Sequence, residues 1–261
     1  MEHDFRSARL GPARIVPSAF FTAGQRQVAA GIVDILDRDA AIGHEPPYHS
    51  RHHVAESVVA MDLLCQQAIK LGLITPELAA LGALAMVGHD LGHDGTLPDT
   101  TRLEEYAAAE VAKLAAGLGA AAVAVMTEVI LATAPSRVTD NLARARSPQA
   151  TPMDMLCAIA NEADVLASLL PTLGWELGDL LAEEWSVHSP TRAALARSFI
   201  GRRTFLQLYA RSTPVAASLG LTRVIARGID AFAPDGPQAL DQMPRAEAMA
   251  RYNERLGAMP V

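Results

Sequence analysis

The chain has 261 residues, half of them hydrophobic, and a formal net charge of −7 with a pI near 5.6. This length and hydrophobic content allow a large buried core, and we expect one domain over residues 1–261. The negative charge argues against binding to a nucleic-acid polymer or an anionic membrane, because no run of Lys and Arg offsets it. No apolar run is long enough to span a bilayer, no signal core is seen, and two cysteines form no motif. We therefore expect a soluble, cytoplasmic protein.

Strand signals are scarce, and Ala and Leu recur at spacings of three and four, which predicts an all-α fold. An apolar stripe predicts a helix from Ser50 to Leu71, and Thr75 followed by Pro76 predicts the start of the next one. That second helix is expected to end at His89 and Asp90. Further helices are expected over 102–118, 121–133, 152–170, 174–184, 190–212, 214–229 and 238–256, with linkers at 134–150 and 231–237.

Five of the eight histidines fall between residues 48 and 95, in two short clusters. In the first cluster, His49 and His53 are four residues apart at a predicted helix start, where this spacing puts two side chains on one face. His52 is offset from that face and is expected to contact solvent. Nitrogen and carboxylate donors at such spacings are typical of a divalent metal site.

The second cluster contains the adjacent pair His89 and Asp90. Neighbouring residues on a regular helix diverge by about 100°, so both can reach one ion only near a helix end. Gly88 and Gly92 loosen the backbone at that point. Alone, an adjacent His-Asp pair is weak evidence, and a histidine bonded to a neighbour is the simpler explanation.

A third candidate is Asp164, which lies on or beside the apolar face of the helix predicted over 152–170. A buried aspartate without a partner costs several kcal/mol, so we expect it to face a cation or a metal. A simple salt bridge or a surface-facing position remains an alternative.

Taken in order, these motifs resemble the HD superfamily of metal-dependent phosphohydrolases, and most closely the class I cyclic-nucleotide phosphodiesterase fold. The resemblance spans roughly residues 48 to 166 and implies an HD/PDEase-like helical bundle. Five segments carry it: Tyr48-His49 to His53, Val87 to Gly95, Leu103-Glu104, Ile130-Leu131-Ala132-Thr133 and Ala163-Asp164.

The resemblance implies a binuclear metal site with a bridging hydroxide as the nucleophile. The first ion would be zinc, iron, manganese or nickel, and the second, shared through Asp90 and held mainly by water, magnesium or manganese. Glu104 and His93 would orient the waters of the second ion, and His49 would be the general acid that protonates the leaving alkoxide. The four ligands of the first ion would be His53, His89, Asp90 and Asp164.

Three positions depart from the family pattern without removing a ligand. Ser50 stands where asparagine is usual, Ala134 where aspartate is expected, and Asp94 where the family has proline. A fourth departure concerns the substrate: the glutamine that reads purine edges would fall near residues 201–205, and no glutamine is there.

Other side chains are therefore candidates for the substrate. Arg202 or Arg203 is a candidate for binding a second phosphate or carboxylate, although exposure to solvent is the simpler explanation of both. Phe205 could stack on a base, but core packing is the more common use of a lone aromatic ring. Tyr48 is a further candidate contact, and Gln207 is a more distant one.

Three functions fit this sequence. The first is a phosphohydrolase, expected to be a phosphodiesterase that acts on a small-molecule phosphate ester, and a homodimer is left open. The second is an HD-type mixed-valent diiron oxygenase, which typically carries a lysine shortly after the HD pair. Here the residues after the HD pair are Leu91-Gly92-His93, and the first lysine that follows the pair is Lys113. The third is a ligand-binding module without turnover, against which the retained ligand positions and His49 argue.

Overall fold

A computed structural model describes residues 18, 20–96 and 100–259, and within these ranges it contains helices and no strand. The all-α prediction is confirmed. The α-helices are α2 (Ala23–Ala41), α3 (Arg51–Lys70), α4 (Pro76–Val87), α5 (Arg102–Leu114), α6 (Ala120–Ala132), α7 (Val138–Ala145), α8 (Pro152–Leu169), α9 (Leu173–Trp185), α10 (Pro190–Arg197), α11 (Phe199–Tyr209), α12 (Pro214–Ser218), α13 (Leu221–Asp230), α14 (Pro237–Asp241) and α15 (Arg245–Ala258). Two short 3-10 helices are η1 (Ala116–Leu118) and η2 (Pro135–Arg137).

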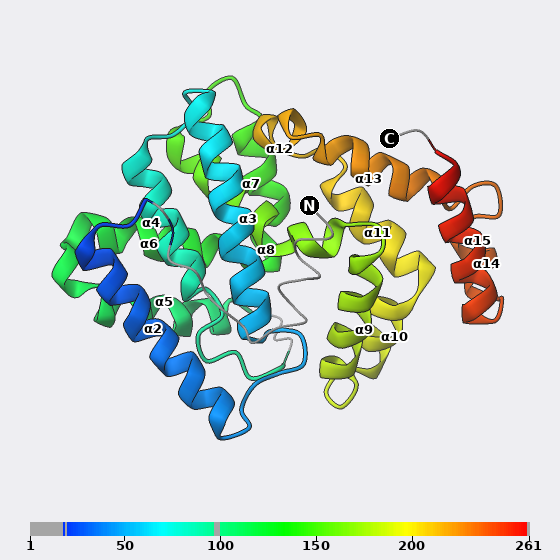
Figure 1. Cartoon of the computed structure of the whole chain (residues 1–261), viewed down its shortest axis with the longest axis horizontal. Coiled ribbons are helices and arrows are strands. Elements are labelled where there is room, and N and C mark those ends of the chain that lie inside the picture. Colours follow the sequence, from blue (N-terminus) through cyan, green and yellow to red (C-terminus); the bar gives the residue numbers. More distant parts are fainter. Residues whose placement is uncertain (1–17, 19, 97–99, 260–261) are drawn as a thin grey trace.

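Helix α3 stands near the centre of the molecule, with α2 and α4–α6 on one side, α7, α8 and α12 next to it, and α9–α11 and α13–α15 on the other side (Figure 1). Helix α3 packs against both α4 and α8, and α8 also packs against α7 and α9. The second group is built on the pairs α9 with α10 and α11 with α13 and α14. The three helices α3, α4 and α8 therefore form the layer that carries or adjoins the predicted metal ligands.

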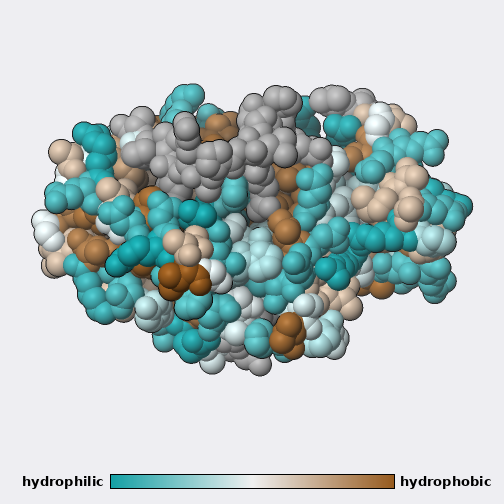
Figure 2. All heavy atoms as spheres, turned by 60° about the horizontal axis from the view of Figure 1, so that its bottom comes forward, coloured by the Kyte–Doolittle hydropathy of each residue, from teal (hydrophilic) through white to brown (hydrophobic). Residues whose placement is uncertain are grey.

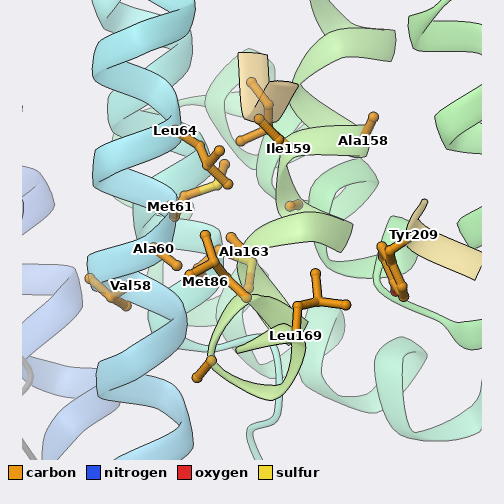
Figure 3. Close-up of a cluster of buried hydrophobic side chains, with 14 of the residues drawn as sticks. Val58, Ala60, Met61, Leu64, Met86, Ala158, Ile159, Ala163, Leu169 and Tyr209 are labelled. Atoms are coloured by element: carbon orange, nitrogen blue, oxygen red, sulfur yellow. The ribbon is translucent and has the colours of Figure 1, made fainter. Parts of the chain in front are cut away.

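The core between these three helices is made of closely packed apolar side chains (Figure 3). Met61 and Leu64 of α3 and Ile159 of α8 are fully buried. Each such side chain contributes about 1.5–3 kcal/mol by leaving water. Gly82 of α4 allows the close approach, because a Cβ there would lie 2.6 Å from Met61 Cε and 2.8 Å from Leu156 Cδ1.

Several helix starts follow local capping rules that the sequence already displays. The Thr75 hydroxyl accepts the backbone N–H of Leu78 at 3.3 Å, and Pro76 occupies the first turn of α4, so the predicted start is confirmed. Thr151 caps α8 in the same way and exchanges hydrogen bonds with Asp154. These caps fix where the helices that position the site begin.

Three long helices predicted in the C-terminal half are each divided in two. The helix predicted over 190–212 breaks at Ser198, whose backbone is extended and whose hydroxyl caps α11 by accepting the Gly201 N–H at 2.9 Å. The helix predicted over 214–229 breaks at Gly220, which adopts a left-handed conformation with φ 84°. The helix predicted over 238–256 is interrupted before Pro244, since the residue preceding a proline disfavours helical geometry.

Two helices were not predicted, α2 and α7, and the second lies inside the stretch 134–150 that was expected to be a linker. Helix α7 is polar overall, yet Asn141 is buried and donates from Nδ2 to the Ala132 carbonyl at 3.0 Å and to Asn161 Oδ1 at 2.8 Å. This satisfied amide lies beside the buried side chains of Val138, Leu142 and Ala145, and together they hold the helix against α8. The linker predicted over 231–237 is confirmed up to Gly236, since α14 begins at Pro237.

The described surface is mainly hydrophilic on the face shown in Figure 2, with hydrophobic residues in small separate groups. Taken one at a time, none of the described helices combines the length and apolar character needed to cross a membrane. Two pairs of consecutive helices reach that length and apolar character only when they are combined, and each pair is sharply bent: α6 with η2–α7, and α8 with α9.

A buried carboxylate joins α8 to α12. The carboxylate of Glu162 accepts the backbone N–H of Thr213 and the Thr213 hydroxyl, both at 2.6 Å. Burial raises the pKa of Glu162 to about 7, although the bonds from Thr213 and the charge of Arg146 oppose the rise. In the folded state, Glu162 is therefore mainly protonated at pH values below about 7.

We expect Glu162 to make the folded protein less stable as the pH rises from about 4.5 to 7. Its folded-state pKa exceeds the unfolded value, so its contribution is complete below pH 4.5 and is lost as the pH rises through 7. The loss should be at most about 3 kcal/mol. Glu162→Gln should remove this pH dependence, as measured by urea unfolding of both proteins in excess chelator. Glu183→Gln, at an exposed position, is the control, and an unchanged profile in Glu162→Gln would contradict the assignment.

Candidate metal centre

Four side chains predicted as metal ligands converge on one point. His53 comes from the first turn of α3 and Asp164 from α8. His89 and Asp90 follow the C-terminal end of α4, which stops at Val87, so they lie in a turn and not on the helix. One donor atom from each residue lies within 4.8 Å of the others, and His53 and His89 are each only 2% exposed.

The donor atoms are spaced as ligands of a single ion would be. His53 Nε2 is 2.9 Å from Asp164 Oδ1, and His89 Nε2 is 3.2 Å from the same oxygen. Oδ2 of Asp90 is 3.2 Å from both imidazole Nε2 atoms. Ligands about 2.0–2.2 Å from a metal lie roughly 2.9–3.4 Å from one another, so these separations fit a common ion.

The tautomer of His89 suits metal binding. Its Nδ1 lies 2.8 Å from the carbonyl oxygen of Met86, which can only accept a hydrogen bond, so Nδ1 carries the hydrogen. The neutral ring then presents its Nε2 lone pair to His53 Nε2, 3.3 Å away. Two nitrogens at this distance need a proton or a cation between them, and a backbone carbonyl on the far nitrogen is the usual support of a metal-binding histidine.

Asp90 supplies the clearest sign of a missing partner. Its Oδ2 is buried, and although both imidazoles are 3.2 Å away, it makes no hydrogen bond in the described part of the chain. Buried polar atoms are almost always hydrogen-bonded. An oxygen aimed between two imidazoles at ion-pair distance is what a shared cation requires, so the donor set fits a divalent metal.

The electrostatics of the cluster lead to the same conclusion. Burial lowers the pKa of His53, but the acidic groups of Tyr48, Asp164 and Asp90 outweigh it and raise that pKa well above its ordinary value. Burial raises the pKa of Asp164, but hydrogen bonds from His53 and His89 outweigh it and lower that pKa below its ordinary value. The two largely covered carboxylates are thus stabilised as anions by positive charge between them.

Glu104 lies in the first turn of α5 and belongs to the same neighbourhood. Burial raises the pKa of Glu104, and so do the charges of Asp90 and Asp164. Its Oε2 is buried, with no hydrogen-bond partner among the described residues. A free carboxylate oxygen near Asp90 suits the expected task of orienting waters on a second ion, and that role stays a prediction.

A second group surrounds His49, and it contains a residue that sequence reasoning missed, Glu184. Nδ1 of His49 is 2.5 Å from Glu184 Oε1, and the other carboxylate oxygen accepts the backbone N–H groups of Tyr48 at 2.9 Å and His49 at 3.0 Å. Burial raises the pKa of Glu184, but the bonds and charge of His49 lower it below its ordinary value. A signal was present: Glu184 continues the buried face of α9 marked by Leu173 and Leu177, where an acid needs a partner.

His93 lies against His49, and its expected role at the waters of a second ion stays a prediction. Its ring stacks on that of His49, with centroids 3.7 Å apart and planes 18° apart, and its Nδ1 accepts the Gly95 N–H at 3.1 Å. Burial lowers the pKa of His93 to about 4, helped by the neighbouring charge of His49. The ring is therefore neutral near pH 7, with its hydrogen on Nε2.

The candidate substrate residues are scattered. Tyr48 is buried beside the cluster, with its hydroxyl 2.9 Å from Ser168 Oγ. Arg202 is 5% exposed, and its guanidinium donates to the carbonyls of Ser168 and, at 2.9 Å, Leu170. It therefore caps the end of α8, and neither its expected exposure to solvent nor a free guanidinium is observed. Phosphate binding by Arg202 is not supported by this placement.

The remaining candidates also lie on α11. Phe205 is half-buried, packs against the core and lies 5.5 Å from the ring of Tyr209. Arg203 is half-buried, and Gln207 is exposed. The structure thus brings the four predicted ligands into one region with Glu104, His49 and Tyr48. The candidate substrate residues of α11 form a separate group.

No protein-family model matches this chain, and no curated protein sequence matches it significantly. Among solved structures, it is similar to the phosphodiesterase domain of the RhoPDE fusion protein from the choanoflagellate Salpingoeca rosetta. That match has a TM-score of 0.57 and 12% identity, and covers 97% of this chain and 99% of the other. The structure of LmjPDEB1 in complex with IBMX matches with a TM-score of 0.53, 13% identity and 98% coverage of both chains.

These identities are too low to transfer an activity, but the coverage extends over nearly the whole chain in both comparisons. The chain therefore has the all-helical fold of class I phosphodiesterase domains, and its His/Asp cluster fits such an HD/PDEase-like fold.

Proposed function

We propose that this protein is a metal-dependent phosphohydrolase, and within that class a phosphodiesterase that acts on a small phosphate ester. The observation that carries the proposal is the convergence of two imidazoles and two carboxylates, with the buried Oδ2 of Asp90 lacking a hydrogen bond. The fold similarity to a phosphodiesterase domain and to LmjPDEB1, which was solved with the small molecule IBMX, supports it.

The metal ligands in this proposal are His53, His89, Asp90 and Asp164. Nitrogen and carboxylate donors together suit zinc, iron, manganese or nickel, and a second ion near Asp90 and Glu104 would be magnesium or manganese. Bound divalent cations supply Lewis acidity, which neutralises a phosphate ester and activates water.

Proton transfer is the task of His49 and Glu184. Glu184 accepts the Nδ1–H of His49 at 2.5 Å, which fixes the ring and leaves Nε2 to deliver a proton. As the P–O bond breaks, its electron pair stays on the leaving oxygen, and that oxygen takes the proton from Nε2. The carboxylate remains ionised and stabilises the imidazolium before the transfer.

A diiron oxygenase and a binding module are the other candidates. Two observations favour the phosphohydrolase over the oxygenase: His49 is paired with Glu184 and not with the Asp90 cluster, and residues 91–95 contain no lysine. Retention of His49 and its carboxylate partner favours an enzyme over a module that only binds. Metal analysis and a phosphodiesterase assay separate the three.

We expect Asp90→Ala to abolish turnover and remove most bound metal. The buried Oδ2 of Asp90 makes no hydrogen bond of good geometry to the two imidazoles that lie 3.2 Å away, and Asp90 is expected to contact both ions. The measurement is metal content by mass spectrometry after dialysis, together with kcat on an aryl phosphodiester. Asp94→Ala is the matched control, because Asp94 is an exposed aspartate outside the cluster, paired with Arg102. Full metal occupancy in Asp90→Ala would remove Asp90 from the ligand set.

We expect His49→Ala to keep its metal and lose turnover by roughly two to four powers of ten, the usual contribution of a general acid. The loss should be much smaller for a p-nitrophenyl ester, whose leaving group departs without a proton. His52→Ala, a change at a histidine in the first turn of α3 that is not in either donor group, is the control. If His49→Ala also loses metal, His49 is a ligand and the diiron alternative gains support.

We expect ordinary 3′,5′-cyclic nucleotides to be poor or unselective substrates. Residues 199–206 contain no glutamine, Gln207 is exposed, and Arg202 is bonded to backbone carbonyls. Without a fixed amide, the pair of donor and acceptor that orients a purine is missing, and a difference of a few kcal/mol between purines is lost. The measurement is kcat/KM for cAMP, cGMP and a generic aryl phosphodiester.

The matched variant for this experiment is Gln207→Ala. It should leave all three kcat/KM values unchanged if Gln207 stays in solvent. A preference of more than about a hundredfold for one cyclic purine nucleotide would contradict the prediction. Loss of such a preference in Gln207→Ala would then identify Gln207 as the group that reads the base.

A further inference from the structure

The Nδ1 atom of His93 is not available to accept a hydrogen bond from metal-bound water. Its Nδ1 lone pair is already used by the Gly95 N–H at 3.1 Å, so the ring offers a single N–H donor at Nε2 and no acceptor. One face of its ring is also covered, because the ring stacks on that of His49 with the centroids 3.7 Å apart. The face of the His93 ring is therefore in contact with the proposed general acid.

The loop that carries His93 holds this stack in a fixed place. The His93 backbone N–H donates to the Asp90 carbonyl at 3.0 Å, and positive φ angles at Gly92 (76°) and Gly95 (74°) turn the chain on either side. A Cβ at Gly95 would approach Glu184 Cγ at 3.3 Å, so the loop also packs against the carboxylate that binds His49. The position of His93 is thus tied to both Asp90 and Glu184.

His93 does not compete for Glu184. Its Nδ1 is 4.0 Å from Glu184 Oε1 and carries no hydrogen, whereas the Nδ1 of His49 is 2.5 Å from the same oxygen. The carboxylate therefore bonds to one imidazole while the other supports that imidazole from its face. Two other aromatic rings near His49 lie nearly perpendicular to it: Tyr48, with centroids 4.8 Å and planes 81° apart, and His53, with centroids 5.6 Å and planes 79° apart.

We propose that His93 is a positioning residue for proton donation: its neutral ring, stacked on His49, keeps Nε2 of His49 directed at the leaving oxygen. This inference rests on the proposed function and adds a role that differs from the orientation of metal-bound water. A single hydrogen bond leaves a ring free to rock about that bond, whereas a parallel ring 3.7 Å away blocks the motion on one side. The face of a neutral aromatic ring also favours a cationic imidazolium. His93 itself exchanges no proton.

The test compares His93→Ala and His93→Phe on two phosphodiesters, one with an alkyl and one with a p-nitrophenyl leaving group. His93→Ala should lower kcat for the alkyl ester roughly 10- to 100-fold, because a misplaced acid no longer reaches the leaving oxygen. KM and the kcat for the p-nitrophenyl ester should change little, since that leaving group needs no proton. His93→Phe, which restores a ring face without restoring Nδ1 or Nε2, should recover most of the alkyl-ester activity.

A second readout does not depend on turnover. In protein loaded with zinc and magnesium, the short His49–Glu184 bond should give a far-downfield proton resonance, assigned by its absence in His49→Ala. In His93→Ala this resonance should broaden or exchange faster with water, and in His93→Phe it should persist. Metal content should be unchanged in both variants. His44→Ala, at an exposed histidine in the preceding loop, is the control and should match the wild type in every readout.

The outcomes separate the two proposals. Wild-type protein that hydrolyses neither ester refutes the proposed function, and the resonance in His93→Ala still decides whether His93 holds His49. Equal losses on both esters without rescue by Phe would show that His93 acts on the nucleophile, which overturns the inference. Unchanged alkyl-ester activity in His93→Ala, or an unchanged resonance, also overturns it.

Discussion

Two carboxylates directed at the same pair of buried imidazoles are the constraint on which the rest of this structure depends. Asp90 and Asp164 each lie about 3 Å from the Nε2 atoms of His53 and His89, and their side chains are only 15% and 22% exposed. Burying one unpaired carboxylate costs several kcal/mol, so two are tolerated only with positive charge between them. Protons on the imidazoles can supply that charge, and a divalent ion can supply more of it while displacing those protons.

The packing of α3, α4 and α8 keeps this arrangement from relaxing. Gly82 lets α4 approach Met61 and Leu156, and the buried layer in Figure 3 fills the space between the helices. Arg202 closes the end of α8 by donating to two of its last carbonyls, and Gly174 leaves room for that guanidinium. Arg202, which the sequence offered as a candidate for binding the substrate, thus supports the helix that carries Asp164.

Much of the metal centre could be predicted from the sequence, because histidine and aspartate stand out in segments with an apolar helical pattern and their spacing indicates which of them share a face. His53 and His89 stood out as histidines, and Asp164 as an acid on an apolar face. Glu184 satisfied the same criterion as Asp164, but its partner His49 is 135 residues away, and nothing local links the two. Pairings of that range depend on how α9 packs, which periodicity does not encode.

The helix boundaries show the same division between local and long-range causes. Caps such as Thr75 and Thr151 act within one turn, so the starts of α4 and α8 followed from the sequence. Helix α7 did not, because it has only eight residues and its buried face combines Val138, Leu142 and Ala145 with the amide of Asn141. The place of that buried amide depends on its partner, the Ala132 carbonyl, which local sequence does not reveal.

The site joins two parts of the fold at the start of α3. His53 faces the cluster built by α4 and α8, whereas His49 faces Glu184 from α9, which also accepts the backbone N–H groups of Tyr48 and His49. Glu184 therefore fixes the entry to α3 as well as the ring of the proposed acid. Removing that carboxylate would disturb both the backbone and the ring, so a variant at Glu184 cannot separate proton donation from local folding. Within the described residues, the ring of His93 bonds to a single backbone group, the Gly95 N–H, and the ring of His49 bonds to none, so changes at these two positions disturb the backbone less than a change at Glu184 and are better suited to examining the chemistry of the site.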